Sequence, residues 1–186
     1  VFDLYRTTGN KSLEGRYKDG LRNGKWSWWN EDNKMDSSGT YNNGIQDGKW
    51  TYWDENGQKK SEITYKDGEY DGLWTYWYEN GRKRSEAIYK DGELKRITDW
   101  DFYTGVKKNE THFSGVDRKG RPILDGRLTV WHRDGQQKAN VENYKDGKPD
   151  GLITRWYANG KKWSEATLKD GKLIEERMWD EDGNLL

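Results

Sequence analysis

Short segments in which apolar and polar residues alternate are separated, along the whole chain, by turns that contain glycine. The segment 73–78 is rich in aromatic and β-branched side chains and ends at the turn pair Asn80-Gly81. This pair tolerates the positive φ angles of a tight turn, and the return segment 84–89 leads to a second turn at Gly92. The pattern therefore predicts antiparallel β-hairpins, and the frequent glycines are incompatible with helices.

The hairpin pattern recurs with a strict period of 24 residues. The first residues of successive copies are 24 positions apart from Tyr17 to Phe113. The next spacing is 31 positions, to Tyr144, and the last is again 24, to Leu168. The longer step places an insertion in the copy that begins at Phe113. We expect one repeat domain over 1–186, which consists of a partial N-terminal repeat (1–16), four regular repeats (17–112), a repeat with an insertion (113–143), a regular repeat (144–167) and a C-terminal capping repeat (168–186).

Consecutive hairpins joined by short turns predict the fold class. Two strands per copy give an all-β, elongated, single-layer antiparallel β-meander built from stacked hairpin repeats of about 24 residues. The turn glycine recurs in each copy, and Asn33 replaces it in the first full copy, because asparagine also tolerates this backbone region. A single layer has no second layer to cover it, so its core must come from side chains on its two faces.

The repeated residues resemble a known family. The copy from Tyr65 reads Tyr-Lys-Asp-Gly, then Asp-Gly-Leu-Trp, Tyr-Trp and Glu-Asn-Gly-Arg-Lys, which is similar to the bacterial variant of the MORN repeat found in YwqK-like antitoxins. The resemblance covers nearly the whole chain, from Phe2 to about Gly183. It implies stacked hairpins in a twisted single-layer sheet that serves mostly as a scaffold or interaction surface. Arg96 departs from the pattern, since it stands where the preceding copy has Gly72.

Composition narrows the class of partner. The chain has 33 basic and 33 acidic residues and a net charge of zero, so no overall positive field attracts nucleic acid. Hydrophobic residues make up only 31%, yet tryptophan and tyrosine number 12 each, so burial depends on aromatic rings. No apolar run approaches the ~20 residues of a transmembrane helix. Because the chain opens at Val1 without a methionine, we expect that a signal or anchor segment has been removed and favour a secreted or lipid-anchored protein, although the compartment is not fixed.

Tryptophan recurs at the fifth position after the second glycine of each copy. This column contains Trp29, Trp53, Trp77, Trp131 and Trp156, with Asp101 in the remaining copy. Residues two and four positions after the same glycine, such as Trp50 and Tyr52, alternate onto the opposite face because strand side chains have a period of two. Either column could pack as the core, or one could stay exposed as a binding ladder for a protein or for sugar rings. The sequence leaves open which face is core.

Charged side chains also repeat, but as a row and not as a catalytic set. Glutamate recurs at the fifth position after the turn glycine, with Lys60, Arg84 or Lys108 two residues before it. A catalytic pair needs two carboxylates in different environments at one place, so this row predicts cross-strand ion pairs on a solvated face. His112 and His132 lack partners at metal-ligand spacing, and the chain has no cysteine. We expect no enzyme activity, no cofactor and no metal.

The irregular copies in the middle of the chain are the strongest candidates for specificity. One copy lacks the second glycine and the column tryptophan, and the next has an insertion between Phe113 and Asp125. Loops that interrupt a regular array commonly carry specificity, and the alternative is that this insertion only bends the sheet. The binding residues assigned on this basis, besides the five column tryptophans, are Arg96, Trp100, Asp101, Arg118 and Arg121.

These patterns together predict a non-enzymatic binding or scaffold module that recognises another protein through an aromatic-rich sheet face. One alternative is a carbohydrate-binding surface module of a secreted or surface-anchored bacterial protein. Another is an antitoxin or immunity role toward a protein partner. A homodimer through the free sheet edges is also open, whereas nucleic acid is not expected as a partner.

Overall fold

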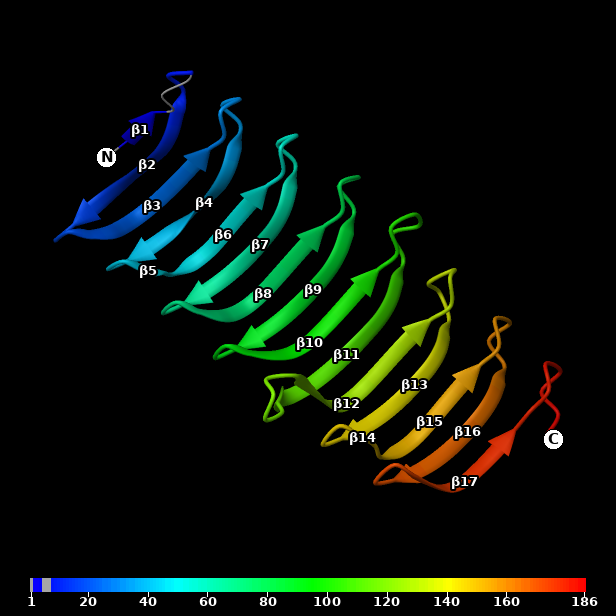
Figure 1. Ribbon diagram of the computed structural model, residues 1–186. Coiled ribbons are helices and arrows are strands. Elements are labelled where there is room, and N and C mark those ends of the chain that lie inside the picture. The colour runs from blue at the N-terminus through cyan, green and yellow to red at the C-terminus, as the bar shows by residue number, and fades with distance from the viewer. Residues whose placement is uncertain (1, 5–7) are drawn as a thin grey trace. The chain divides into compact units, whose positions relative to one another are not determined.

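The computed structural model describes residues 2–4 and 8–186, and every regular element in them is a β-strand (Figure 1). Residues 1 and 5–7, which belong to the predicted partial repeat 1–16, lie outside the described residues. The strands are β1 (Phe2–Leu4), β2 (Lys11–Lys18), β3 (Leu21–Trp29), β4 (Met35–Asn42), β5 (Ile45–Gln46), β6 (Gly48–Trp53), β7 (Lys59–Lys66), β8 (Glu69–Trp77), β9 (Lys83–Lys90), β10 (Glu93–Trp100), β11 (Lys107–Val116), β12 (Pro122–Trp131), β13 (Lys138–Lys145), β14 (Lys148–Pro149), β15 (Gly151–Trp156), β16 (Lys162–Lys169) and β17 (Lys172–Met178).

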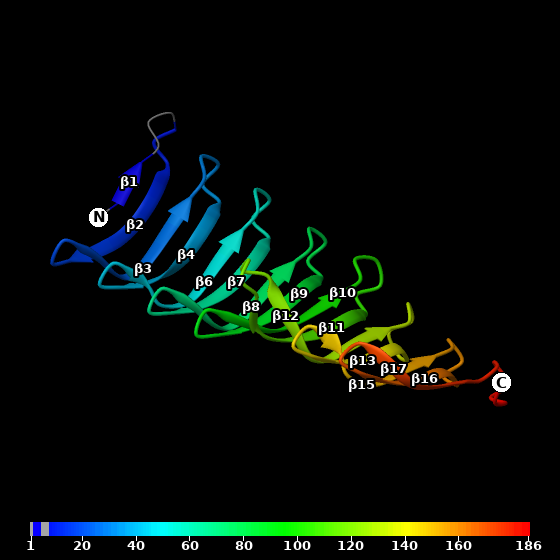
Figure 2. The ribbon, with the colours of Figure 1, turned by 60° about the horizontal axis from the view of Figure 1, so that its bottom comes forward.

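The chain divides into two compact units, Val1–Glu93 and Leu94–Leu186, which we call unit 1 and unit 2. Within each unit the strands pair antiparallel with their neighbours along the chain and form a single layer (Figures 1 and 2). The two-residue strands β5 and β14 interrupt this order only locally, since β4 also pairs with β6 and β13 with β15. The predicted all-β meander of hairpins is therefore confirmed within each unit.

The turns have the backbone geometry that the sequence predicts. Asp67 and Gly68 both have positive φ angles, 51° and 86°, which is the geometry of a two-residue hairpin turn that matches the twist of the strands. The same pairing of a positive-φ Asp or Asn with glycine recurs at 19–20, 43–44, 91–92, 146–147 and 170–171. At the other end of the hairpins Asn33 has a φ of 60°, so it does replace the turn glycine of the other copies.

The face of unit 1 that carries Trp26 and Trp50, here called the core face, contains its most buried large side chains. These two residues are 1% and 3% exposed. Trp26 lies on Gly15 and Trp50 lies on Gly39, so closely that a Cβ at Gly39 would be 2.1 Å from the indole Cδ2. Trp50 Nε1 also donates a hydrogen bond to the Thr40 carbonyl oxygen at 3.1 Å. The single layer thus gains a core because glycine lets each indole reach the backbone.

The third tryptophan of the core face, Trp74, is packed differently. It pairs with Ile63, which occupies the place that glycine has beneath Trp50. Its ring lies against Tyr70 and Tyr89 instead, at centroid distances of 5.2 and 5.7 Å. Its Nε1 is buried without a hydrogen-bond partner among the described atoms. The question that the sequence left open is answered for unit 1, since its core lies on this face and not on the tryptophan column.

The opposite face, here called the column face, carries the tryptophan column beside paired lysine and glutamate side chains. The prediction that Lys60 lies on the same strand face as Glu62, from its place two residues earlier, is wrong, and so are the equivalent placements of Arg84 and Lys108. A β-bulge pairs Trp53 with Lys59 and leaves Lys60 as the extra residue. Lys59 therefore lies on the face of Glu62, and its Nζ is 2.7 Å from Glu62 Oε1. The same pairing recurs at Lys11–Glu14, Lys83–Glu86, Lys107–Glu110 and Lys162–Glu165.

The ion pair between Lys59 and Glu62 predicts a pH dependence of stability. The hydrogen bond from Lys59 holds the pKa of Glu62 below its ordinary value. Because the folded-state pKa lies below the unfolded-state value, the pair stabilises the fold above the unfolded-state pKa, and this contribution is lost as pH falls through the folded-state pKa. In urea unfolding, Glu62→Gln is expected to cost less than ~1 kcal/mol at neutral pH and to cost nothing in acid.

The control for this measurement is Glu55→Gln, which changes an exposed turn carboxylate that forms no ion pair within the described part of the chain. The control is expected to retain the pH dependence of the wild type. If Glu62→Gln also retains it, the ion pair contributes nothing to the stability.

Candidate functional site

The register of β10 identifies the residue that continues the tryptophan column in unit 2. Trp77 of β8 pairs with Lys83, and Trp100 of β10 pairs with Lys107, in each case three residues before the glutamate of the ion pair. The prediction that Asp101 replaces the column tryptophan is therefore wrong. Counting by a fixed period failed because β10, which ends at its column tryptophan, has eight residues, whereas β8 has nine.

Arg96 also lies one register position away from its predicted place, for the same reason. It pairs with His112 on the column face, one position beyond the place of the second glycine, so its assignment as a glycine replacement is wrong. Burial, the largest influence, would raise the pKa of Glu110, but the hydrogen bond from Lys107 and the charges of Lys107 and Arg96 hold it below its ordinary value. Arg96 thus adds a positive charge beside the row of ion pairs on the column face.

The insertion extends one hairpin instead of forming a separate loop. β11 and β12 have ten residues each, and a turn at Asp117 closes their tip. Asp117 Oδ2 lies 2.7 Å from Arg121 Nη2, and Oδ1 accepts the backbone N–H of Lys119 at 2.8 Å. Arg121 therefore stabilises the tip, whereas Arg118 is exposed on it. Binding by these two arginines stays a prediction.

The column tryptophans predicted to bind are all half-buried, namely Trp29, Trp53, Trp77, Trp131 and Trp156. The Lys11 ammonium lies 5.3 Å from the ring centroid of Trp29, and that of Lys107 lies 5.0 Å from Trp131. Trp77 is covered by a lysine in the same way. A sugar or peptide group would have to displace these cations to stack on the rings, so the contacts favour packing over an open ladder.

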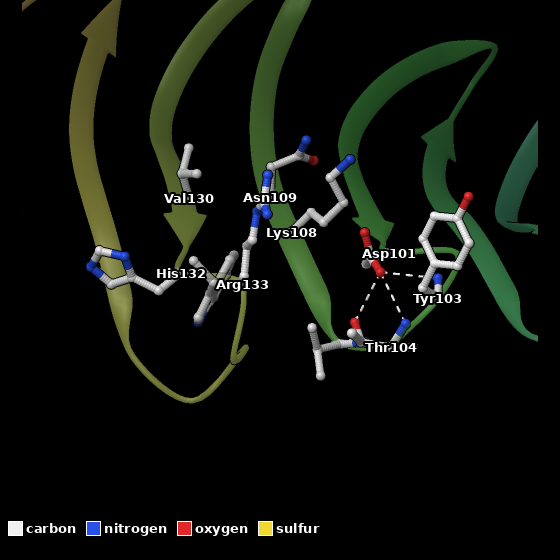
Figure 3. Close-up of a pocket in the computed structure, with 10 residues that line it drawn as sticks. Asp101, Tyr103, Thr104, Lys108, Asn109, Val130, His132 and Arg133 are labelled. Carbon is white, nitrogen blue, oxygen red and sulfur yellow. Dashed lines mark hydrogen bonds between the residues drawn. The ribbon is translucent and has the colours of Figure 1, made fainter. Parts of the chain in front are cut away.

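In unit 2 we call the face that carries Val130 and the buried Ile153 the core face, and it departs from that of unit 1 at Val130. In unit 1 Tyr52 pairs with Ser61 at this register position, whereas in unit 2 Val130 pairs with Asn140. Because valine lacks the aromatic ring of tyrosine, a hollow of about 640 Å³ lies over it (Figure 3). The side chains that line this hollow, besides Val130, include Asp101, Tyr103, Lys108, Asn109, Trp131 and Arg133.

Two lengthened turns frame the hollow. In the turn 54–58 a backbone N–H donates to the carbonyl oxygen four residues further on. In the turns 101–106 and 132–137 the acceptor is five residues further on, so each is longer by one residue. These two turns lie against each other, since a Cβ at Gly135 would be 2.3 Å from Val106 Cβ. The extra residues and the missing ring together open the sheet surface at this point.

Comparison with protein families identifies the repeated hairpin. The model of the MORN repeat variant matches residues 22–43, 46–67, 70–91 and 149–170. Four hairpins of this chain match the MORN repeat variant. They make up somewhat less than half of the chain, and the residues that line the hollow lie between the third and fourth MORN-variant repeats. Comparison with curated proteins gives no match, and the narrower resemblance to bacterial YwqK-like antitoxins stays a prediction.

The lining of the hollow beside the MORN-variant repeats carries one carboxylate, Asp101, and the cations Lys108 and Arg133. Asp101 Oδ1 accepts hydrogen bonds from Thr104 N (2.9 Å), Thr104 Oγ1 (3.0 Å) and Tyr103 N (3.0 Å). The bond from Thr104 N, the other two bonds and the charge of Lys108 hold the pKa of Asp101 below its ordinary value, so its charge stabilises the turn. Lys108 and Arg133, in contrast, form no ion pair with any residue that the structure describes.

Two buried amide oxygens beside Val130 lack a hydrogen-bond donor. Asn109 and Asn140 flank Val130, since each pairs with it across the sheet. The Oδ1 atom of each is buried, with no partner in the described residues. Asn140 Nδ2 donates to Glu142 Oε1 at 2.8 Å, so the Asn140 amide cannot be reversed without losing this bond. An unsatisfied buried acceptor costs about 1–3 kcal/mol.

Glu142 brings a carboxylate onto the core face but does not neutralise the hollow. It accepts a hydrogen bond from the Tyr144 hydroxyl at 2.6 Å, and Arg155 Nη2 lies 3.8 Å from its Oε1. Burial, together with this bond to Glu142, raises the pKa of Tyr144 to about 12. The charge of Glu142 is thus compensated by its own neighbours.

Sequence reasoning identified two of the lining residues, Asp101 and Trp131, and missed Lys108, Asn109, Val130 and Arg133. The available signal was a valine at the register position where three of the four MORN-variant repeats have an aromatic residue, as at Tyr52, and the fourth has Arg155. Among residues 2–4 and 8–186, no group of three or more His, Asp and Glu side chains could hold a metal ion. No helix in the same residues has the length and apolarity to cross a bilayer.

Proposed function

We propose that the protein is a non-enzymatic binding module that recognises another protein at the hollow over Val130. The observation that carries this proposal is the coincidence of the missing aromatic ring with the two lengthened turns. Turn residues held by a rigid repeat scaffold are where repeat proteins place recognition. The MORN-variant repeats supply that scaffold, and the hollow supplies a concave surface of a size typical of ligand sites.

The aromatic residues of the turn 101–106 support a protein as the partner. Tyr103 is 81% exposed, and Phe102 contacts it edge to face at a centroid distance of 5.0 Å. Exposed aromatic side chains beside a charged pocket are typical anchors of protein interfaces. An antitoxin or immunity role would be one form of this recognition.

The replacement Val130→Tyr tests the proposal, because it restores the residue that unit 1 has at this register position. The added ring is expected to fill the hollow and to reduce partner binding at least about tenfold, while the thermal midpoint stays close to that of the wild type. The measurement is a quantitative pull-down from the source cells, in which the retained protein is identified and its affinity is then measured with purified components.

Charge reversals provide the matched comparison for this experiment. Arg133→Glu, at the hollow, is expected to weaken the same partner, whereas Lys172→Glu, at an exposed position of β17, is expected to leave it unchanged. A partner that binds wild type, Val130→Tyr and Arg133→Glu equally well does not use the hollow, and the proposal is then wrong.

A further inference from the structure

We propose that the hollow over Val130 takes an aromatic side chain of the partner protein, whose ring occupies the place where unit 1 has a ring of its own. This inference rests on the proposed function and specifies the chemistry of its ligand. Figure 3 shows Val130 together with the cations Lys108 and Arg133 among the side chains that line the hollow.

Unit 1 shows that the sheet surface accommodates an aromatic ring at this register position. The residue directly before the column tryptophan is aromatic in each of its three full copies, namely Trp28, Tyr52 and Tyr76. The Tyr52 ring stacks beside Trp50, with 6.2 Å between the centroids and 29° between the planes. Val130 has the same place before Trp131, and the hollow of about 640 Å³ lies over it. The space that a ring fills in unit 1 is therefore open to a ligand here.

Apolar surface lines this space from the strand and from one of the lengthened turns. Val130 and Val106, the latter in the turn 101–106, are both half-buried and line the hollow. Tyr103 of the same turn also lines it and is 81% exposed. A ring that covers these surfaces removes apolar area from water on both partners. Aromatic side chains bury the largest such area, and they are the usual anchors in interface pockets.

The cations of the hollow favour an aromatic ring over an aliphatic group of the same size. Lys108 has the place of Arg84, since each directly follows the lysine that pairs with a column tryptophan. In unit 1 the Arg84 Cζ atom lies 5.7 Å from the ring centroid of Tyr76, so a cation at this place lies over a neighbouring ring. The charge of Lys108 also acts on Asp101, but a neutral ring does not compete with that carboxylate. Attraction to the ring face thus adds to the burial of apolar surface.

Short blocked peptides titrated into the full-length protein test this chemistry. The probe is acetyl-Ala-Phe-Ala-amide, followed by the methyl signals of Val130 and Val106 in proton–carbon NMR spectra. The ring current of a phenyl group shields protons that face the ring, so the Val130 signals are expected to move upfield. Saturation is expected in the millimolar range, which is ordinary for a fragment of this size. The leucine analogue, which has a smaller side chain and no ring, is expected to bind about tenfold more weakly.

The cyclohexylalanine analogue separates aromatic character from size. It keeps the bulk and the apolar surface of the side chain but has no aromatic ring face, and it is expected to bind the wild type about threefold more weakly than the phenylalanine peptide. In the double variant Lys108→Gln with Arg133→Gln, the two peptides are expected to bind equally. If they bind the wild type equally, or if the Val130 signals do not move upfield, the inference is overturned.

Two replacements of Val130 supply matched controls, with the methyl signals of Val106 as the readout. Val130→Tyr provides the ring from the chain itself and is expected to abolish binding of the phenylalanine peptide. Val130→Thr has nearly the shape of valine and leaves the hollow open, so it is expected to bind the peptide within about twofold of the wild type. Equal binding by both variants would show that the peptide does not use this position, which contradicts the inference.

Failure of this inference and failure of the proposed function give different results. If the pulled-down partner depends on Val130 but the phenylalanine peptide does not bind, the hollow recognises protein through other chemistry and only the inference is wrong. If the partner is indifferent to Val130→Tyr, the proposed function itself is wrong.

Discussion

Gly39→Ala is expected to destabilise the protein by about 3 kcal/mol, at the upper end of the usual cost of overpacking. The added Cβ would be 2.1 Å from Trp50 Cδ2, a separation at which the indole must move. Any such movement breaks the hydrogen bond from Trp50 Nε1 to the Thr40 carbonyl oxygen and exposes a ring that is now 3% accessible. Urea unfolding followed by far-ultraviolet circular dichroism measures the loss.

The matched control is Gly57→Ala, at a turn glycine with a φ of 82° and no atom within 4 Å of the added Cβ. It measures the cost of a side chain at a positive φ, about 1 kcal/mol, without a steric clash, whereas Gly39 has no positive φ and its variant has the clash alone. Combining Gly39→Ala with Trp50→Leu is expected to recover part of the stability, because the smaller side chain makes room. If Gly39→Ala loses no stability, the contact between Gly39 and the indole has no energetic importance.

Trp50→Ala is expected to cost about 3–5 kcal/mol, and Trp53→Ala only about 1–2 kcal/mol. Trp50 is buried on the core face beneath the rings of Trp28 and Tyr41, at centroid distances of 5.6 and 5.0 Å. Trp53 is half-buried on the column face. The two residues are three positions apart in the same strand, so each serves as the control for the other in unfolding experiments.

The stability of Trp53→Ala also tests the hypothesis that the tryptophan column binds a partner. If Trp53→Ala unfolds the protein as strongly as Trp50→Ala, the column is a second core, and the assignment of the core to one face is wrong. If Trp53→Ala is well folded, it can be used in pull-down experiments, where it is expected to retain the partner that Val130→Tyr loses.

The strands and turns could be predicted because they depend on local sequence. Turn chemistry alone fixed the positive φ of Asn33 and of Asp67, and the period of two separated the faces. The choice of core face could not be predicted, because aromatic residues alternate onto both faces. It depends on what lies one strand away, namely a glycine beneath Trp50 and a lysine over Trp77.

The candidate site could be predicted only in part, for two physical reasons. Counting by period assumes copies of constant length, and a strand shorter by one residue, β10, moved the column from Asp101 to Trp100. The hollow depends on side chains from neighbouring strands and on two turns that meet in space. Its cause, the small side chain of Val130, is visible in the sequence only after the register with Tyr52 is known.

Trp26 packs on Gly15 and Trp50 packs on Gly39, so in unit 1 these core contacts run from a later residue back to an earlier one. In both cases the indole covers a glycine that precedes it by 11 residues. During synthesis each tryptophan therefore leaves the ribosome after the backbone on which it packs, so a hairpin can close its core without waiting for the next one. Folding of unit 1 can then keep pace with translation from the N-terminus, with every closing contact short in sequence.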